Sequence, residues 1–211
     1  MPPRQWTGEK RAWVERRLGT GTAVRRDGMA RIKIRERKEM TEEQKRIYDA
    51  TAAGKRGGVP APLAVWLESP VLAERAQKLG EFARYETSLG ARLSELAILV
   101  VARHWTSQFE WSVHKEEALK AGVDPAVIED IANRREPRFQ SEEERAVYEF
   151  SVTLNETHAV PEALYRRAVA AIGERGVVEL VGILGYYTLI SMTLNTFEIE
   201  PPEGWAAELK P

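Results

Sequence analysis

The chain has 211 residues, enough for one large or two small domains, and its 43% hydrophobic and 30% charged residues are typical of a globular protein. A formal net charge of -1 gives no overall case for nucleic acid or a membrane surface as a partner. The absence of cysteine excludes disulfides, cysteine-ligated zinc, thiolate nucleophiles and thiol peroxidase chemistry.

The charge is unevenly distributed along the chain. Residues 1–40 carry 12 Lys and Arg against 5 Asp and Glu, whereas the remainder carries 19 against 27. Residues 1–28 also lack a sustained apolar period, and we interpret them as a basic, partly disordered extension of a domain that covers residues 29–211. A basic arm that touches nucleic acid or anionic lipid is the alternative. The first residues lead into charges and not into an apolar segment, so we expect no signal peptide and a cytoplasmic location.

The first predicted helices follow clear start signals. Thr41-Glu42-Glu43-Gln44 has the form of a capping box, which predicts a helix from Thr41 to about Gly54. Ser69-Pro70 combines a helix-capping residue with proline at the first helical position, which predicts a second helix. After Gly90, the residues from Leu93 to Ala102 form a strongly apolar helix.

The second half of the chain shows the same signals. Asp124-Pro125 and Ser141-Glu142-Glu143-Glu144 each predict a helix start. Pro161 opens another helix, which Gly173 separates from the next. No segment alternates apolar and polar residues for long enough to predict a sheet, so the predicted fold class is all-α.

The last predicted helix runs from Val177 to about Phe197 and is the most apolar part of the chain. Its length raises the question of a membrane span. The rest of the chain has the pattern of a helical bundle, which favours a buried core helix instead. We therefore expect no membrane partner, and Pro201-Pro202 is expected to end the ordered core.

The two halves are predicted to be a degenerate repeat, about 60–122 and 141–200. A constant offset of 84 residues pairs Glu95 with Glu179, Ser107 with Ser191 and His114 with Glu198. Both segments are long apolar helices with one glutamate near the start. Chance similarity between two apolar helices is the alternative.

Three residues form the candidate catalytic site: Glu95, Glu110 and His114. Glu95 lies inside an apolar helix, where a carboxylate must find a partner, become neutral or face a cavity. Glu110 and His114 are four residues apart and share one helical face. On one straight helix Glu95 and Glu110 would be about 22 Å apart, so the chain must turn between them if they cooperate.

A helix break is predicted between these residues. Ser107-Gln108-Phe109-Glu110 has the form of a capping box, so a new helix can start at Ser107. A hairpin around residues 104–106 then brings Glu110 and His114 back towards Glu95. Two other interpretations stay open: Glu110 is only the capping carboxylate, and Glu95 is only an ion-pair partner of Arg92, Arg103 or a neighbouring subunit.

Metal and nucleophile chemistry have little support in the sequence. Glu110 and His114 supply two possible metal ligands, but the Glu-x-x-His pairs of di-iron bundles and the His-Glu-x-x-His of zincins are both absent. A nucleophilic Ser107–His114 pair is compatible with the spacing, although it has no motif. We therefore expect no metal and no cofactor.

The segment from Glu95-Leu-Ala-Ile-Leu-Val to Glu110-Trp-Ser-Val-His114 resembles the carboxymuconolactone decarboxylase family of the alkylhydroperoxidase D-like superfamily. The resemblance extends from about Met29 to Pro202. In the peroxidase branch, Cys-x-x-Cys stands between the glutamate and the histidine; here Ser107 and Glu110 occupy the cysteine positions. The resemblance thus implies a cysteine-less member with an alkylhydroperoxidase D-like helical bundle.

The same resemblance implies a cofactor-free lyase for a lactone acid from aromatic catabolism, in homo-oligomers that are trimers or hexamers, with a dimer as a further possibility. Glu110 and His114 are expected to transfer protons, with Glu95 orienting His114. Arg84, Arg92 and Arg103 are candidates to bind a substrate carboxylate. The expected substrate-binding residues are Trp105, Trp111, Tyr85, Arg84 and His104; ordinary core packing is the alternative for the aromatic ones. An isomerase or hydrolase for a related small molecule, a non-catalytic binding protein of the same fold and a metal-dependent enzyme are the competing functions.

Overall fold

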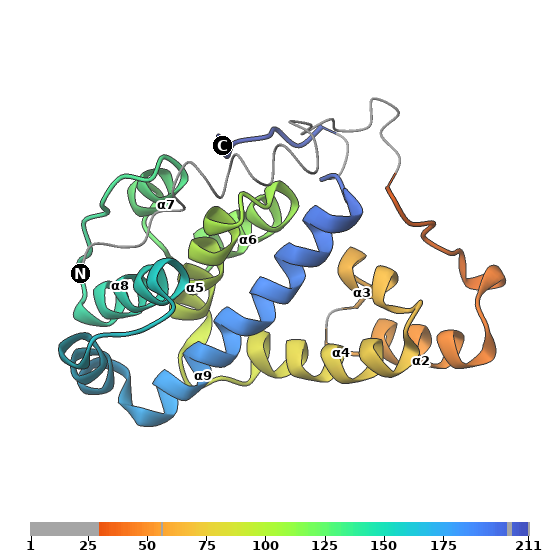
Figure 1. The fold of residues 1–211 in the computed structure, drawn as a ribbon, viewed down its shortest axis with the longest axis horizontal. Coiled ribbons are helices and arrows are strands. Elements are labelled where there is room, and N and C mark those ends of the chain that lie inside the picture. Colours follow the sequence, from red (N-terminus) through yellow and green to blue (C-terminus); the bar gives the residue numbers. More distant parts are fainter. Residues whose placement is uncertain (1–29, 56, 202–203, 211) are drawn as a thin grey trace, which may run out of the picture.

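The computed structural model describes residues 30–55, 57–201 and 204–210, so the basic extension at residues 1–28 lies outside the described residues. Within these ranges there are α-helices, one short 3-10 helix and no strand, which confirms the all-α prediction (Figure 1). The elements in chain order are η1 (Arg37–Glu39), α2 (Glu42–Ala52), α3 (Ala61–Trp66), α4 (Pro70–Tyr85), α5 (Gly90–His104), α6 (Gln108–Lys120), α7 (Pro125–Ala132), α8 (Glu142–Thr157) and α9 (Glu162–Phe197).

Helix α5 forms the centre of the core. All of its residues from Ser94 to Arg103 are buried. It packs against α6, α8 and α9, while α2, α3 and α4 lie together towards the other end of α9 (Figure 1). A charged group on α5 is therefore surrounded by protein, and its environment is set by the helices that pack on it.

Three of the predicted helix starts are capped by side chains. Thr41 Oγ1 accepts a hydrogen bond from the amide of Gln44 at 3.3 Å, and the Gln44 carboxamide oxygen accepts one from the amide of Thr41 at 2.9 Å. Asp124 caps the amide of Ala126 at 2.8 Å, and Ser141 Oγ caps that of Glu144 at 3.2 Å. These bonds satisfy amides that have no partner within their helices, which explains why the capping patterns located the helices correctly.

Helix α9 contains the break that was predicted at Gly173. Gly173 has φ 73° and ψ 165°, a conformation that interrupts the helical backbone and that glycine adopts without a Cβ clash. Within the described residues, α9 is the one helix long and apolar enough to cross a membrane, but 61% of its most apolar window is buried inside the protein. That burial is the pattern of a core helix, and the cytoplasmic location stays a prediction.

The prediction that the core ends at Pro201-Pro202 is wrong. Residues 204–210, which we term the C-terminal strap, lie along α5 and α6, and the Leu209 side chain is only 4% exposed. Gln108 Nε2 donates to the Leu209 carbonyl at 2.6 Å, and the Leu209 amide donates back to Gln108 Oε1 at 3.1 Å. A single buried leucine with a reciprocal pair of hydrogen bonds makes no periodic pattern, so this contact could not be predicted from the sequence.

The internal repeat stays a prediction. Glu95 and Glu179 are both buried carboxylates near the start of a buried helix. Their partners differ, because Glu179 accepts hydrogen bonds from Ser88 and from Arg175. The break after α5 also has no counterpart at the equivalent place in α9, which continues to Phe197.

Candidate active site

A sharp turn after α5 brings the candidate residues together. Helix α5 ends at His104 and α6 begins at Gln108. Between them, Thr106 adopts a left-handed conformation with φ 49°, and the amide of Ser107 donates to the carbonyl of Ala102 at 2.8 Å. The predicted helix break is thus confirmed, and α6 runs back along α5.

The predicted capping box at Ser107 is not formed. Ser107 makes no side-chain cap, and its fully buried hydroxyl has no hydrogen-bond partner among the described residues. The Glu110 carboxylate instead points along α6, where its Oε1 lies 2.9 Å from Nε2 of His114. The carboxylate binds the buried imidazole more strongly than it would bind an amide at the helix start, because the carboxylate and the imidazolium can each carry a full charge.

His114 is held between two carboxylates. Its Nδ1 lies 2.5 Å from Oε2 of Glu95 on α5, and its Nε2 lies 2.9 Å from Oε1 of Glu110 on α6. All three side chains are buried, with His114 itself only 3% exposed. When both ring nitrogens face carboxylates, both must donate, so this geometry favours the imidazolium form.

The electrostatics of the cluster agree with that geometry. Burial alone would lower the pKa of His114, but the negative charges of Glu95 and Glu110 and their hydrogen bonds raise it to about 9. His114 is therefore charged at neutral pH and holds a proton on each ring nitrogen. Such a group can act as a general acid, and its two carboxylate partners fix the orientation of the ring.

A small cavity opens beside this cluster. Its volume is about 220 Å³, and Glu110 and His114 form part of its wall together with Arg84 from α4 and Tyr187 from α9. Apolar side chains from the start of α3, from α6 and from α9 complete the lining. An apolar cavity of about 150 Å³ accepts benzene, so this cavity is large enough for a substituted ring.

Arg84 and Tyr187 supply further polar groups to the wall. Burial acts to lower the pKa of Arg84, but the nearby Tyr187, Tyr85 and Glu95 raise it, so the guanidinium is firmly cationic. Arg84 forms an ion pair with Glu117 that is long, at 3.4 Å. Burial, together with Glu110 and Glu95, raises the pKa of Tyr187, whose ring packs edge-on against that of His114 at 5.0 Å. Tyr187 thus remains a neutral hydroxyl.

The other expected substrate-binding residues lie elsewhere. Tyr85 is exposed and stacks under the Arg84 guanidinium at 5.6 Å. Trp111 is fully buried and donates from Nε1 to Glu208 of the C-terminal strap at 3.2 Å. His104 and Trp105 pack edge-to-face at the C-terminal end of α5, and His104 lines a different cavity. None of these four is among the described residues that line the 220 Å³ cavity.

The structure distinguishes between the three candidate arginines. Arg92 pairs with Glu144 at 3.4 Å, and Arg103 donates to Thr106 and to the Lys210 carbonyl. Arg84 alone of these three lines the cavity beside His114. Tyr187 also lines this cavity, although it was not among the site residues predicted from the sequence.

The arrangement is unsuited to chelating one metal ion. Glu95 and Glu110 occupy opposite nitrogens of the same ring, so the two carboxylates cannot converge with a ring lone pair on a single cation. Within the described residues, no group of three potential ligands is placed to hold a metal. The chemistry available to these residues is proton transfer and electrostatic stabilisation.

Comparison with known sequences identifies one family. The model of the carboxymuconolactone decarboxylase family matches residues 70–151, the segment from α4 into α8 that contains Arg84, Glu95, Glu110 and His114. No curated protein matches the chain.

Solved structures show the same fold at low sequence identity. A protein of unknown function from Agrobacterium tumefaciens, named as a candidate antioxidant defence protein AhpD, has a TM-score of 0.59 and 19% identity over 65% of this chain and 95% of its own. An uncharacterized peroxidase-related protein from Silicibacter sp. TM1040 has a TM-score of 0.68 and 13% identity over 83% and 93% of the two chains. A variant of the debrominase Bmp8 in complex with 2,3,4-tribromopyrrole has a TM-score of 0.61 and 13% identity over 77% and 87%. These likenesses establish an alkylhydroperoxidase D-like helical fold.

Proposed function

Because residues 70–151 match the model of the carboxymuconolactone decarboxylase family, we propose that the protein is a cofactor-free carbon–carbon lyase for a small lactone or ring carboxylic acid. The observation that carries the proposal is His114, held between Glu95 and Glu110 at the wall of a cavity of about 220 Å³. The cavity has room for one substituted ring, which limits the substrate to a small molecule.

The reaction needs one proton and no electron acceptor. When the bond between the ring carbon and the carboxylate breaks, carbon dioxide leaves and the electron pair stays on the ring, delocalised to the lactone carbonyl as an enolate. A proton delivered to the conjugated carbon then completes the product, and solvent returns a proton to the protein. The enzyme must therefore supply an acid and stabilise a developing negative charge.

The cavity wall contains a group for each task. Glu110 and His114 share a proton that lies next to the cavity, and we assign them the transfer step. Glu95 is a positioning residue, because it reaches the cavity only through His114 Nδ1. Arg84 is suited to stabilise the enolate oxygen rather than the departing carboxylate, since an ion pair with that carboxylate would oppose its loss.

Turnover of candidate ring acids by purified variants tests this function. In His114→Ala and Glu110→Gln, release of carbon dioxide should fall by about 10²–10⁴-fold, the usual contribution of a general acid. The substrates to test are the lactone acid that the family resemblance implies and related ring acids. Glu116→Gln is the matched control, because Glu116 is an exposed glutamate on the same helix. Circular dichroism checks that each variant keeps its helices. Unchanged turnover in both site variants would reject the assignment.

The same experiment separates the competing functions. Saturable thermal shifts without any product would indicate a binding protein that keeps the fold and has no chemistry. Product of unchanged mass would indicate an isomerase, and a product one water heavier would indicate a hydrolase. Each of these outcomes would contradict the proposed lyase activity. In each case the cavity beside His114 would remain the proposed ligand site.

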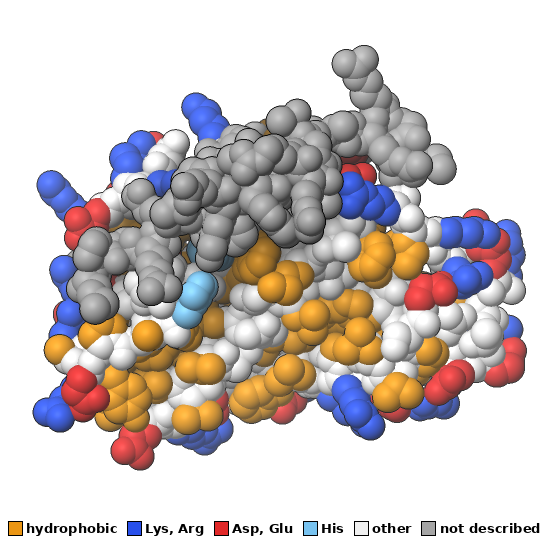
Figure 2. Space-filling view, viewed as in Figure 1, with side chains coloured by type: hydrophobic (Ala, Val, Ile, Leu, Met, Phe, Trp, Pro, Cys, Tyr) orange, Lys and Arg blue, Asp and Glu red, His pale blue; other side chains and the backbone are white. Residues whose placement is uncertain are grey.

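We further propose that the protein is a homo-oligomer that associates through the outer face of α9. Val178, Val181 and Met192 are exposed there, with Val178 at 71%, and Figure 2 shows hydrophobic side chains spread over the face that α9 and α4 present. Apolar side chains in such a row are typical of an interface between subunits. Light scattering of wild type and Val178→Asp tests it: the variant should dissociate, and a wild-type monomer would contradict the proposal.

A further inference from the structure

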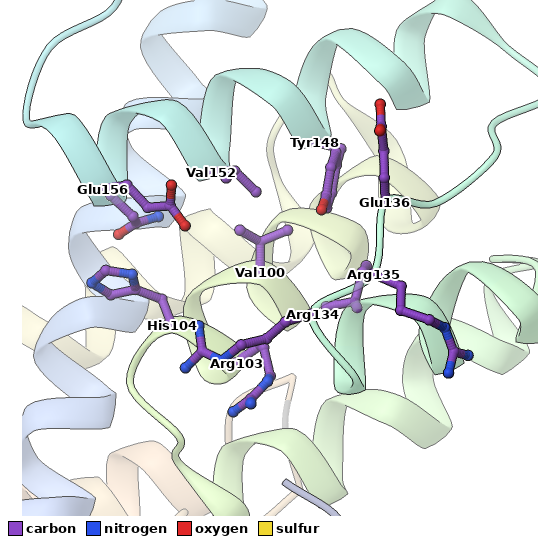
Figure 3. A pocket seen from close by; sticks show the side chains of 11 residues that line it. Val100, Arg103, His104, Arg134, Arg135, Glu136, Tyr148, Val152 and Glu156 are labelled. Carbon is purple, nitrogen blue, oxygen red and sulfur yellow. The ribbon is translucent and has the colours of Figure 1, made fainter. Parts of the chain in front are cut away.

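A second cavity lies between α5, α7 and α8 (Figure 3). Its volume is about 280 Å³, and none of the described residues that line it also lines the cavity beside His114. Arg103 and Glu95 are eight residues apart on α5, which separates the two sites by about 12 Å along that helix. Nothing in the proposed lyase reaction uses this second cavity, which we term the α5–α8 cavity.

Two arginines of this cavity lack carboxylate partners among the described residues. Arg103 is only 5% exposed; its Nη1 and Nη2 donate to Thr106 and the Lys210 carbonyl, but its buried Nε has no partner. The backbone amide of Arg134 donates to the Ile131 carbonyl at 3.1 Å, but its side chain forms no hydrogen bond or ion pair with the described residues. The neighbouring Arg135, by contrast, is bound by both Glu129 and Asp130.

The two guanidinium groups lie close together. Figure 3 shows the side chains of Arg103 and Arg134 next to each other, whereas that of Arg135 points away. Burial lowers the pKa of Arg103, and the positive charge of Arg134 lowers it further. Two neighbouring cations without an anion between them repel each other, and a buried donor without an acceptor is costly, so a bound anion would relieve both.

The backbone at Arg134 is also unusual. Arg134 follows the last turn of α7 and has φ 55°, in the left-handed region where glycine is strongly preferred after a helix. A residue with a side chain is less stable in this conformation than glycine. The conformation directs the arginine side chain to the cavity wall, which it lines.

The remaining wall is mixed: Glu136 and Glu156 also line the cavity, but its three arginines outnumber them, and part of the wall is apolar. Val100, Ile131 and Val152 contribute aliphatic surface, and the Tyr148 ring borders the same space (Figure 3). An inorganic anion would leave this apolar surface unfilled, whereas a ring that carries one carboxylate would contact both kinds of group. We propose that the α5–α8 cavity is a second small-molecule site, which binds a monoanionic organic acid of the aromatic carboxylate type through Arg103 and Arg134.

Calorimetric titration of the full chain with benzoate tests this site. Benzamide serves as the uncharged analogue and inorganic phosphate as the anion without an apolar body. Arg134→Gln should weaken benzoate binding by at least about tenfold, the loss expected for one charge-assisted carboxylate contact. Arg138→Gln is the matched control, because Arg138 is exposed, nearby in the chain and outside the cavity lining. Since the Arg134 side chain is exposed and has no hydrogen-bond or ion-pair partner among the described residues, its replacement should leave the fold intact.

Benzoate could also enter the cavity beside His114, so Arg84→Gln is titrated in parallel. Binding that survives Arg84→Gln and is lost in Arg134→Gln supports the proposal, whatever the outcome of the lyase assay. Binding that is lost in Arg84→Gln and retained in Arg134→Gln overturns it, as does the absence of benzoate binding. Benzamide or phosphate binding as tight as benzoate would overturn the ligand class.

Discussion

Glu95 and His114 are nineteen residues apart in the chain, yet Oε2 of Glu95 lies 2.5 Å from Nδ1 of His114. The contact exists because α5 ends at His104 and α6 returns alongside it. Glu110, one turn before His114 on α6, then holds the other ring nitrogen. The imidazole is thereby fixed from two helices, and any shift between α5 and α6 would change its hydrogen bonds and its charge state.

The stability of the protein should fall at alkaline pH through His114. Its pKa is about 9 in the folded protein, above the value of about 6.5 expected in the unfolded chain. The stabilisation is therefore fully present below about pH 6.5 and is lost as the pH rises through about 9. The difference between the two pKa values corresponds to about 3 kcal/mol in the free energy of unfolding.

Urea unfolding of wild type and His114→Gln at a series of pH values measures this effect. The stability advantage of wild type should shrink by about 3 kcal/mol between about pH 6.5 and pH 10, because the variant lacks the titrating ring. Other groups that titrate at alkaline pH are common to both proteins and cancel in the difference. An advantage that stays constant across this range would contradict a charged His114.

Replacing Glu95 should shift the pH profile of the proposed reaction. Glu95→Gln removes one of the two negative charges that raise the pKa of His114, so the alkaline limb of turnover should move to lower pH. Glu95→Asp keeps the charge and should restore part of the profile. A merely structural role for Glu95 would lower turnover equally at every pH, and that result would contradict its assignment as a positioning residue.

Ser107→Ala should have little effect on stability. The Ser107 hydroxyl is buried without a hydrogen-bond partner among the described residues. Its removal therefore abolishes the free-energy cost of burying an unpaired hydroxyl and breaks no helix cap. Ser141→Ala is the matched comparison, because Ser141 does cap the amide of Glu144. We expect a loss of about 1 kcal/mol for Ser141→Ala and a change within about 0.5 kcal/mol for Ser107→Ala. Equal losses in the two variants would mean that Ser107 caps α6 in solution.

The helices were predictable because their signals are local. Thr41, Asp124 and Ser141 cap the helices that they were expected to start, and Gly173 breaks α9 where its sequence neighbours indicated. The grouping of Glu95, Glu110 and His114 was also predictable, because a buried carboxylate must find a partner and the i, i+4 spacing limits the choices.

The features that were missed depend on packing between distant segments. The alternative in which Glu110 only caps α6 is wrong, because its carboxylate binds His114, but the capping pattern at Ser107 gave no means to exclude it. Arg84, Arg92 and Arg103 have similar sequence surroundings, and only the packing of α4 against α9 brings Arg84 to the cavity beside His114. Aromatic residues near a site motif, such as Trp111, are often core residues, and sequence alone did not separate the two roles.

The C-terminal strap should contribute measurably to the stability of α6. Leu209 is 4% exposed, whereas Leu79 on α4 is 46% exposed, so the two residues form a matched pair for replacement by alanine. Leu209→Ala should lower the free energy of unfolding by about 2 kcal/mol, because it leaves a cavity under the strap, and Leu79→Ala should change it by no more than about 0.5 kcal/mol. Hydrogen exchange should show the loss of protection in α6 first, since Gln108 bonds directly to Leu209. If both variants unfold like wild type, the strap does not pack on α6 in solution.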